Sequence, residues 1–251
     1  MTRNSERSWT KWGEIDPYFG VVSHDKFRKG NLDAETLGQF FLSGQEHVDT
    51  VMSLATRICP EIQMGSVLDF GCGVGRLLFP FAKLFKRAVG VDISEGMRRE
   101  LGVNTVKFSV SNVEVHRDLE HFLEGEYFDL VHSYIVLQHI ETGYGIKLIE
   151  SLAGMVKPEN GMVALHVTYW RNSSLLRKLV HYLRARIGPI NWLINSIQGQ
   201  AFSTPLMQMN SYSLNSIFER LHHLGFVEFS AYPTNHSGHL GLMILGRREV
   251  K

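Results

Sequence analysis

Three glycines and an aspartate follow a short apolar run in a spacing that suits a nucleotide-like ligand. The run Ser66–Phe70 has the Val and Leu content of a buried parallel strand. Glycines 71, 73 and 75 follow it, and they let the backbone turn sharply and let a ligand lie against the main chain. The apolar residues after the turn recur at helical spacing; they are Leu77, Leu78, Phe81 and Leu84. The order strand, glycine turn, helix predicts a cofactor site at the carboxyl end of the strand.

A second acid follows the next apolar run. Asp92 ends the stretch Ala88–Val91 and lies 23 residues after Asp69. This is close to the roughly 20-residue distance between a glycine turn and a ribose-binding acid in a βαβ unit. An ionised carboxylate accepts hydrogen bonds from both ribose hydroxyls. The alternative is that Asp92 only caps the helix that begins near Ser94.

Two segments resemble a known family. The D-x-G-x-G-x-G run from Asp69 to Gly75 resembles motif I of the class I S-adenosylmethionine (SAM)-dependent methyltransferases, because a dinucleotide fingerprint would read G-x-G-x-x-G. The run F-D-L-V-x-S-x-x-V-L-x-H-I from Phe128 to Ile140 resembles motif IV of the small-molecule members. The resemblance covers residues 65–248. It implies an α/β fold with a Rossmann-like, seven-stranded, mostly parallel sheet whose last strand is antiparallel, with helices on both faces.

The resemblance also implies the cofactor and its contacts. SAM would bind and leave as S-adenosylhomocysteine (SAH), and no metal is expected. The expected cofactor-binding residues come from the glycine turn, the ends of the second, third and fourth strands, and the leader: Asp69, Gly71, Cys72, Gly73, Gly75, Arg76, Asp92, Ile93, Ser94, Met97, Asn112, Val113, Ser133, Tyr134, Ile135, Tyr18 and Phe19.

Asn112 is a departure from the family pattern. We predict the third strand at Thr105–Val110, and members of this class often carry an acid just after it that accepts a hydrogen bond from the adenine amine. This chain has Asn112 at that place. Its amide oxygen still accepts a hydrogen bond, while Val113 would offer an apolar edge.

Two histidines follow predicted strands and are candidates for a catalytic base. His139 comes after the fourth strand and His166 lies near the end of the fifth. A base is needed only if the acceptor is a hydroxyl or a protonated amine, and either histidine could instead be structural. The expected substrate-binding residues lie around the same end of the sheet: Gln138, Tyr169, Trp170, Arg171, Met207 and His236.

An insertion separates the fifth strand from the last helix. Residues 169–210 exceed what a class I core needs, and no Asp or Glu occurs from Asn160 to Phe218, a run of 59 residues. In the family this insertion point lies over the substrate opening, where a field of one sign would attract an anion. The segment predicts a helical lid over an acidic or phosphorylated acceptor, or contact with an anionic membrane surface. A solvated lid whose arginines pair with acids elsewhere is the alternative.

Composition narrows the class of protein. The chain has 251 residues, 44% of them hydrophobic, with a net charge of +1, which suits one sizeable core and gives no sign of a nucleic-acid binder. Two cysteines form no disulfide framework, and the polar start is unlike a signal peptide. We therefore expect a cytoplasmic protein without a transmembrane segment; peripheral membrane contact stays open, and the sequence leaves the oligomeric state undetermined.

The elements divide the chain into four parts. Residues 1–60 are expected to form a leader rich in aromatic residues and a helical cap, with an irregular start over 1–32 and a helix from Asp33 to Cys59 that Gly44 could divide. Residues 61–168 would form the SAM-binding core, 169–210 the lid, and 211–251 a helix and strand pair that complete the core.

The expected reaction is methyl transfer to an oxygen of a small-molecule, glycan or lipid-linked acceptor. Two alternatives stay open: a methyltransferase that acts on RNA or protein, and a non-catalytic SAM-binding partner protein. No RNA-binding module is recognised, and Ser133–Val136 does not read N-P-P-Y, the motif of amino-methylating nucleic-acid enzymes.

Overall fold

Seven strands form a single sheet in this computed structural model, which describes residues 3–122, 125–171, 207–236 and 238–249. The strand order is β3-β2-β1-β4-β5-β7-β6. The strands are β1 (Ser66–Phe70), β2 (Arg87–Val91), β3 (Val113–His116), β4 (Leu130–Ser133), β5 (Met162–Arg171), β6 (Phe226–His236) and β7 (His239–Arg248). The first five pair in parallel, and β7 pairs antiparallel with both β5 and β6. The predicted sheet is confirmed.

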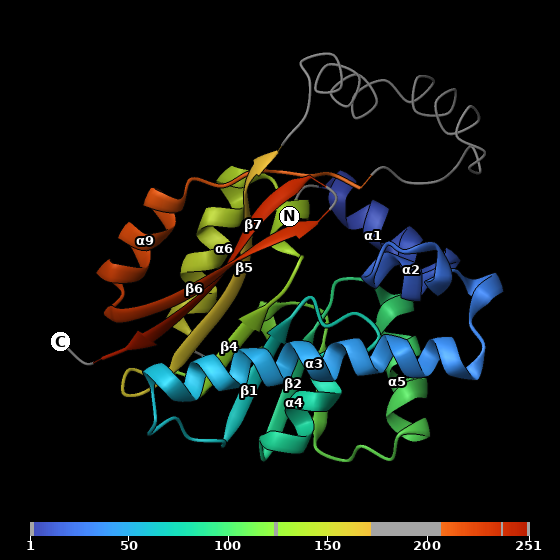
Figure 1. Ribbon diagram of the computed structural model, residues 1–251, viewed down its shortest axis with the longest axis horizontal. Helices are drawn as coiled ribbons and strands as arrows, with labels where there is room; N and C mark the ends of the chain where they lie inside the picture. Colours follow the sequence, from blue (N-terminus) through green and yellow to red (C-terminus); the bar gives the residue numbers. More distant parts are fainter. Residues whose placement is uncertain (1–2, 123–124, 172–206, 237, 250–251) are drawn as a thin grey trace.

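Helices cover both faces of the sheet (Figure 1). One face packs on α3 (Ala34–Ile58), α4 (Leu78–Leu84) and α5 (Glu95–Lys107), and the other on α6 (Thr142–Gly154) and α9 (Leu214–His223). Alternate residues of β1 show the division, because Val67 joins the first core and Leu68 the second. Short 3-10 turns lie at Asp25–Phe27, Lys29–Asn31, Leu119–His121 and Leu137–His139.

The leader is helical rather than irregular. Its elements are α1 (Arg3–Ile15) and α2 (Pro17–Val21). Trp12 packs with Tyr18, Phe40 and Met97 in a third apolar cluster, so the aromatic residues that look unpatterned form the inner side of a helical cap. The helix predicted from Asp33 is confirmed and continuous: the Asp33 side chain accepts a hydrogen bond from the Thr36 N–H at 2.7 Å.

The third strand was predicted at the wrong place. Thr105–Lys107 belong to α5, Ser109 turns the chain with φ +53°, and the strand occupies Val113–His116. The β-branched residues Thr105 and Val106 suggest a strand, but α5 continues because its inner side packs on the core through Leu101. The strand therefore begins eight residues later than predicted, at Val113 instead of Thr105, and other residues follow it at the cofactor end of the sheet.

Among the residues that the structure describes, none of the helices combines the length and apolarity that a membrane span requires.

Candidate cofactor and acceptor site

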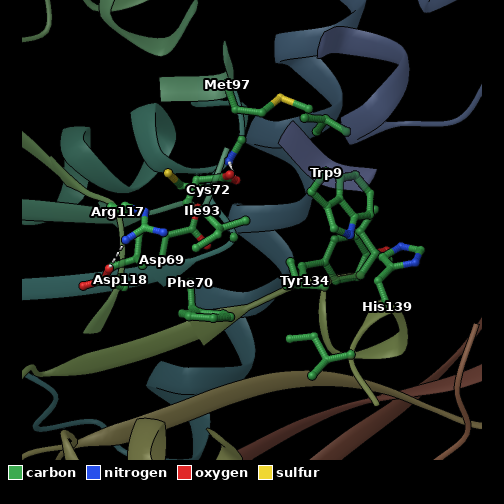
Figure 2. Close-up of a pocket in the computed structure, with 18 of the residues that line it drawn as sticks. Trp9, Asp69, Phe70, Cys72, Ile93, Met97, Arg117, Asp118, Tyr134 and His139 are labelled. Carbon is green, nitrogen blue, oxygen red and sulfur yellow. Dashed lines mark hydrogen bonds and ion pairs between the residues drawn. The ribbon is translucent and has the colours of Figure 1, made fainter. Parts of the chain in front are cut away.

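A cleft lies at the carboxyl ends of β1, β2, β3 and β4. Its volume is about 1180 Å³, which includes the solvent space at its opening. Figure 2 shows Asp69, Cys72 and Ile93 on one side of it and Trp9, Tyr134 and His139 on another. Of the expected cofactor residues, these line the cleft: Asp69, Gly71, Cys72, Gly73, Arg76, Asp92, Ile93, Met97, Tyr134 and Ile135. Gly75, Ser94 and Ser133 lie next to lining residues in the chain and do not line it themselves.

The glycine turn adopts a conformation that only glycine takes without strain. The φ angles are +78° at Gly71, +55° at Gly73 and +94° at Gly75. The N–H groups of Gly71 and Cys72 both donate to the Val91 carbonyl, at 2.7 and 3.1 Å. The turn is therefore folded against β2, and its backbone forms a wall of the cleft.

Asp92 braces this turn. Its Oδ2 accepts a hydrogen bond from the Gly73 N–H at 2.9 Å, and its Oδ1 accepts one from the Ser94 N–H at 2.8 Å. Ser94 itself caps α5 by accepting from the Met97 N–H. Burial raises the pKa of the Asp92 carboxyl to about 6. The carboxylate thus spans the glycine turn and the start of α5, and it faces the cleft.

Asp69 has one oxygen in use and one without a partner. Its Oδ1 accepts a hydrogen bond from His132 Nδ1–H at 2.8 Å, and His132 Nε2 lies 3.1 Å from His47 Nε2. The buried Oδ2 has no hydrogen-bond partner among the described residues. The sequence gives no sign of His132 and His47 as functional residues, because they come from β4 and α3 and only the fold brings them to Asp69.

Arg76 is a buried cation on the wall of the cleft. Only 5% of it is exposed. Its Nη1 donates to Ser43 Oγ at 3.3 Å, and its Nε is buried without a partner among the described residues. In that part of the chain no acidic group lies within ion-pair distance of it. Burial lowers the pKa of Arg76, so an anion in the cleft would stabilise its charged form.

Of the two candidate bases, His139 lines the cleft and His166 does not. His139 Nδ1–H donates to the Gln208 carbonyl at 2.6 Å, its Nε2 lies 3.3 Å from the Gln138 amide nitrogen, and its ring meets Trp9 at 4.8 Å. Burial lowers the pKa of His139 to about 4. The ring is therefore neutral at neutral pH, with its lone pair on Nε2.

His166 lies under the sheet surface. It is fully buried on β5, and its Nε2 lies 2.7 Å from Thr234 Oγ1. Its ring packs 5.1 Å from Tyr134 and 5.2 Å from His236. Burial lowers the pKa of His166 to about 3. Tyr134 thus stands between the cleft and this histidine, so His166 has no described route to an acceptor.

The leader reaches the cleft with other residues than expected. Tyr18 points away from it, because its hydroxyl donates to Glu100 at 2.8 Å and its ring packs on Phe40. Phe19 packs on Trp12 and lies under the Arg28 guanidinium. The lining residues of α1 and α2 are Trp9, Gly20 and Val21. The many aromatic residues indicate that this segment packs on the domain. Which of its side chains face the cleft depends on their positions around the helices.

Asn112 lies at the opposite edge of the sheet. It precedes β3, and its amide donates to the carbonyls of Ala82 and Phe85, at 2.8 and 2.9 Å, at the end of α4. The adenine position proposed for Asn112 and Val113 is therefore wrong. The residues that follow β3 and line the cleft are Arg117, Asp118, Leu119 and Glu120. Asp118 is the first acid after β3 and lines the cleft.

The expected acceptor residues are only partly brought together. Gln138 is buried and accepts a hydrogen bond from Thr168 at 2.9 Å. His236 lies 3.5 Å from the Tyr134 hydroxyl. Tyr169, Trp170 and Arg171 end β5 and, like Met207, lie outside the cleft wall. Residues 172–206 of the predicted lid, and with them most of its basic charge, lie outside the described residues.

Comparisons agree with this architecture. A family profile described as "Methyltransferase domain" matches residues 45–227. Protein RP789 of Rickettsia prowazekii (strain Madrid E) is 30% identical over 79 residues, which make up 31% of this chain and only 14% of that relative's length.

Two solved structures share the fold. Magnesium protoporphyrin IX methyltransferase (ChlM) from Synechocystis PCC 6803 with bound SAM is 19% identical, with 99% of each chain covered and a TM-score of 0.61. N-methyltransferase NodS from Bradyrhizobium japonicum WM9 with SAH is 14% identical, with 98% of each chain covered and a TM-score of 0.58. The match to the family profile spans more than half of the chain, so the resemblance to class I methyltransferases is confirmed and the chain belongs to the methyltransferase-domain family.

Proposed function

We propose that this protein uses SAM to methylate an oxygen of a small-molecule acceptor. The observation that carries the proposal is the set of groups around one cleft: a glycine turn, Asp92 and Asp69 all meet at the carboxyl ends of β1 and β2. This is the switch-point edge at which open α/β sheets bind ligands. The family match adds methyl transfer as the class of reaction.

The cleft has partners for each part of the cofactor. Asp92 would accept hydrogen bonds from the ribose hydroxyls, and Asp118 would accept one from the adenine amine beside Ile93. The glycine turn would lie against the methionine part. Its ammonium and carboxylate suit two atoms of the cleft wall that are buried without a partner in the described structure, Asp69 Oδ2 and Arg76 Nε.

The remaining wall would hold the acceptor. Trp9, Tyr134 and His139 form it, and α1 covers it. SAM supplies a methyl group on a positively charged sulfur. The chain's own contribution is to align the acceptor oxygen in line with that methyl group and to exclude water. As the oxygen–carbon bond forms, the sulfur–carbon bond breaks, and neutral SAH leaves.

The state of His139 favours an acceptor that needs little help from a base. Its Nε2 faces the Gln138 amide, and its pKa of about 4 makes it a weak proton acceptor. A carboxylate is already ionised at neutral pH, and an acidic hydroxyl gives up its proton readily. We therefore propose an oxygen acid as the acceptor, bound in its ionised form, so that the methyl transfer itself moves no proton.

Binding and turnover test the proposal separately. SAH should bind the wild-type protein in calorimetry, and Asp92→Ala should weaken that binding by about tenfold or more, because a hydrogen-bonded charge is lost. Incubation with methyl-labelled SAM and a fractionated extract of organic acids should label a small product. No SAH binding would contradict the cofactor proposal. SAH binding with label only in RNA or protein would contradict the acceptor proposal.

A further inference from the structure

A chain of hydrogen-bonded side chains runs from the buried Asp69 through the buried His132 to the half-buried His47. The three residues come from β1, β4 and α3, and Asp69 and His132 are 2% and 0% exposed. The contacts are 2.8 Å from His132 Nδ1 to Asp69 Oδ1 and 3.1 Å between the Nε2 atoms of His132 and His47. Nothing in the methyl-transfer step uses the two histidines directly.

These contacts fix the orientation of both rings and of the carboxylate. His132 is held at both of its ring nitrogens, and its ring packs against Phe81 at 5.0 Å. His47 packs on Tyr134 with ring centroids 3.9 Å apart. A side chain fixed in this way cannot turn without breaking a hydrogen bond and leaving a buried polar group unpaired.

The fixed rings leave one Asp69 oxygen unpaired. Oδ1 accepts a hydrogen bond from the His132 N–H, so Oδ2 is the oxygen without a partner among the described residues, and Asp69 lines the cleft. His47 does not compete for this charge, because burial and the nearby His132 and Arg76 lower its pKa to about 2 and keep it neutral. His47 therefore adds no positive charge to this chain of side chains.

We infer that His132, held in place by His47, is a positioning residue that aims Asp69 Oδ2 at the ammonium group of the methionine part of the ligand. The inference rests on the proposed function, because SAM and SAH bring that ammonium group into the cleft. This role gives a reason for the buried His132 to bond Asp69 of the glycine motif and for the half-buried His47 to bond His132. His132 acts through Asp69 and does not touch the ligand.

Two ligands isolate this effect. SAH carries the amino-acid part, whereas 5′-methylthioadenosine has the same adenosine and sulfur but no ammonium group. The ratio of their dissociation constants measures the contribution of the amino-acid part in each variant. His132→Gln removes the donor at the Nδ1 position, because the Gln amide reaches the position of Nε2. We expect it to weaken SAH binding by about tenfold or more and to leave 5′-methylthioadenosine binding unchanged.

His132→Asn is the matched control. An Asn amide nitrogen occupies roughly the position of the histidine Nδ1, so it keeps a donor to Asp69 Oδ1 while losing the contact with His47. We expect it to retain more of the preference for SAH than His132→Gln does. His47→Phe keeps an aromatic ring against Tyr134 and removes both ring nitrogens, including the Nε2 that contacts His132; its loss should be intermediate and confined to SAH.

The outcomes separate this inference from the proposed function. Equal loss of both ligands in His132→Gln would indicate damage to the fold, and unchanged binding of both would show that the His132 donor is not needed. Either result would overturn the positioning role. A wild-type protein that binds both ligands equally would keep the adenosine site and overturn the role of Asp69. A wild-type protein that binds neither would contradict the proposed function itself.

Discussion

The acids of the cleft differ in what they already hold. One Asp92 oxygen accepts a hydrogen bond from the Gly73 N–H and the other accepts one from the Ser94 N–H. One Asp69 oxygen accepts a hydrogen bond from His132, and the other has no partner among the described residues. A carboxylate oxygen accepts more than one hydrogen bond, so Asp92 can brace the glycine turn and still receive hydroxyl groups. Its bracing role makes the cleft sensitive to its charge.

Ligand binding should depend on pH through Asp92. Burial raises the pKa of its carboxyl to about 6 in the free protein, whereas ribose hydroxyls donate to the ionised form and lower that pKa on binding. Below pH 6 Asp92 must lose a proton before SAH binds, so the dissociation constant of SAH should rise about tenfold for each unit by which the pH falls. Above pH 7 it should be flat. Calorimetry between about pH 5 and pH 8 measures this.

Asp92→Asn is the control for that profile. It has no proton to lose, so SAH binding should be weaker at neutral pH, and the step near pH 6 should disappear. A step that persists in Asp92→Asn would assign the titration to another group and contradict the role of Asp92.

The glycine turn should tolerate no side chain. Gly71→Ala requires a left-handed residue at φ +78° and drives its Cβ into the Val136 side chain. We expect a loss of about 1–3 kcal/mol in the free energy of unfolding and weaker SAH binding. Gly102→Ala is the matched control, since Gly102 lies in α5 with open space around it. It should stabilise the protein by about 0.5–1 kcal/mol. Urea unfolding of both variants provides the comparison.

The success of the sequence prediction at this scale depended on distance along the chain. Asp69, the glycines and Asp92 belong to one βαβ unit, so their spacing carried the information. His132 is 63 residues from Asp69 and 85 from His47, and no local pattern connects them. The same limit applies to Arg76. It was expected to bind the cofactor, but its burial beside Ser43 depends on the packing of α3 and could not be predicted.

Between elements, the crossing of α1 and α5 decides how the cleft is covered. The helices approach so closely that Gly13 and Gly96 stand where larger residues would clash: a Cβ on Gly96 would lie 2.5 Å from the Gly13 carbonyl. The Arg117–Glu6 ion pair at 2.9 Å also connects α1 to the loop after β3. This pair is exposed and contributes little stability, so the glycine contact is the stronger constraint.

Gly96→Ala should therefore lift α1 from α5 and move Trp9 away from the cleft wall. We expect faster hydrogen exchange at the amides of α1 and weaker SAH binding, with the rest of the sheet protected as before. Gly102→Ala changes the same helix without touching α1 and should leave both properties unchanged. If exchange in α1 stayed slow in Gly96→Ala while binding fell, the covering role of α1 would be wrong.

Across the whole molecule, the two ends of the sheet have different tasks. At the amino-terminal edge polar groups are paired: Asp129 accepts from the Ser66 N–H at 2.7 Å and binds Lys157, and Asn112 bonds the end of α4. At the carboxyl edge, buried polar atoms of Asp69 and Arg76 lack partners in the described structure. Unpaired buried groups are costly, and these two line the cleft, where a ligand would pair them.

The sheet order could be predicted because its motifs follow one another along the chain in the family's order. The leader and the third strand could not. Whether Thr105 and Val106 form a strand or extend α5 depends on packing of that helix against the core, which local residue preference does not contain. Because the third strand was predicted too early in the chain, Asn112 was expected at the carboxyl end of that strand, whereas it lies at the amino-terminal end. The same misplacement also left Asp118, for which we propose the adenine contact, out of the expected site.

Asn112 and Asp118 therefore provide a test of the division between the two edges. Asn112→Ala removes the donor to the Ala82 and Phe85 carbonyls and should lower the free energy of unfolding by about 1–3 kcal/mol, with SAH affinity unchanged. Asp118→Ala should do the opposite: SAH binding should weaken by about tenfold, since an acceptor for the adenine amine is lost, and unfolding should change little because this side chain is a third exposed. Urea unfolding and calorimetry on both variants measure the contrast. Weaker SAH binding in a stably folded Asn112→Ala variant would return the adenine contact to Asn112 and would contradict the strand position on which the assignment of Asp118 depends.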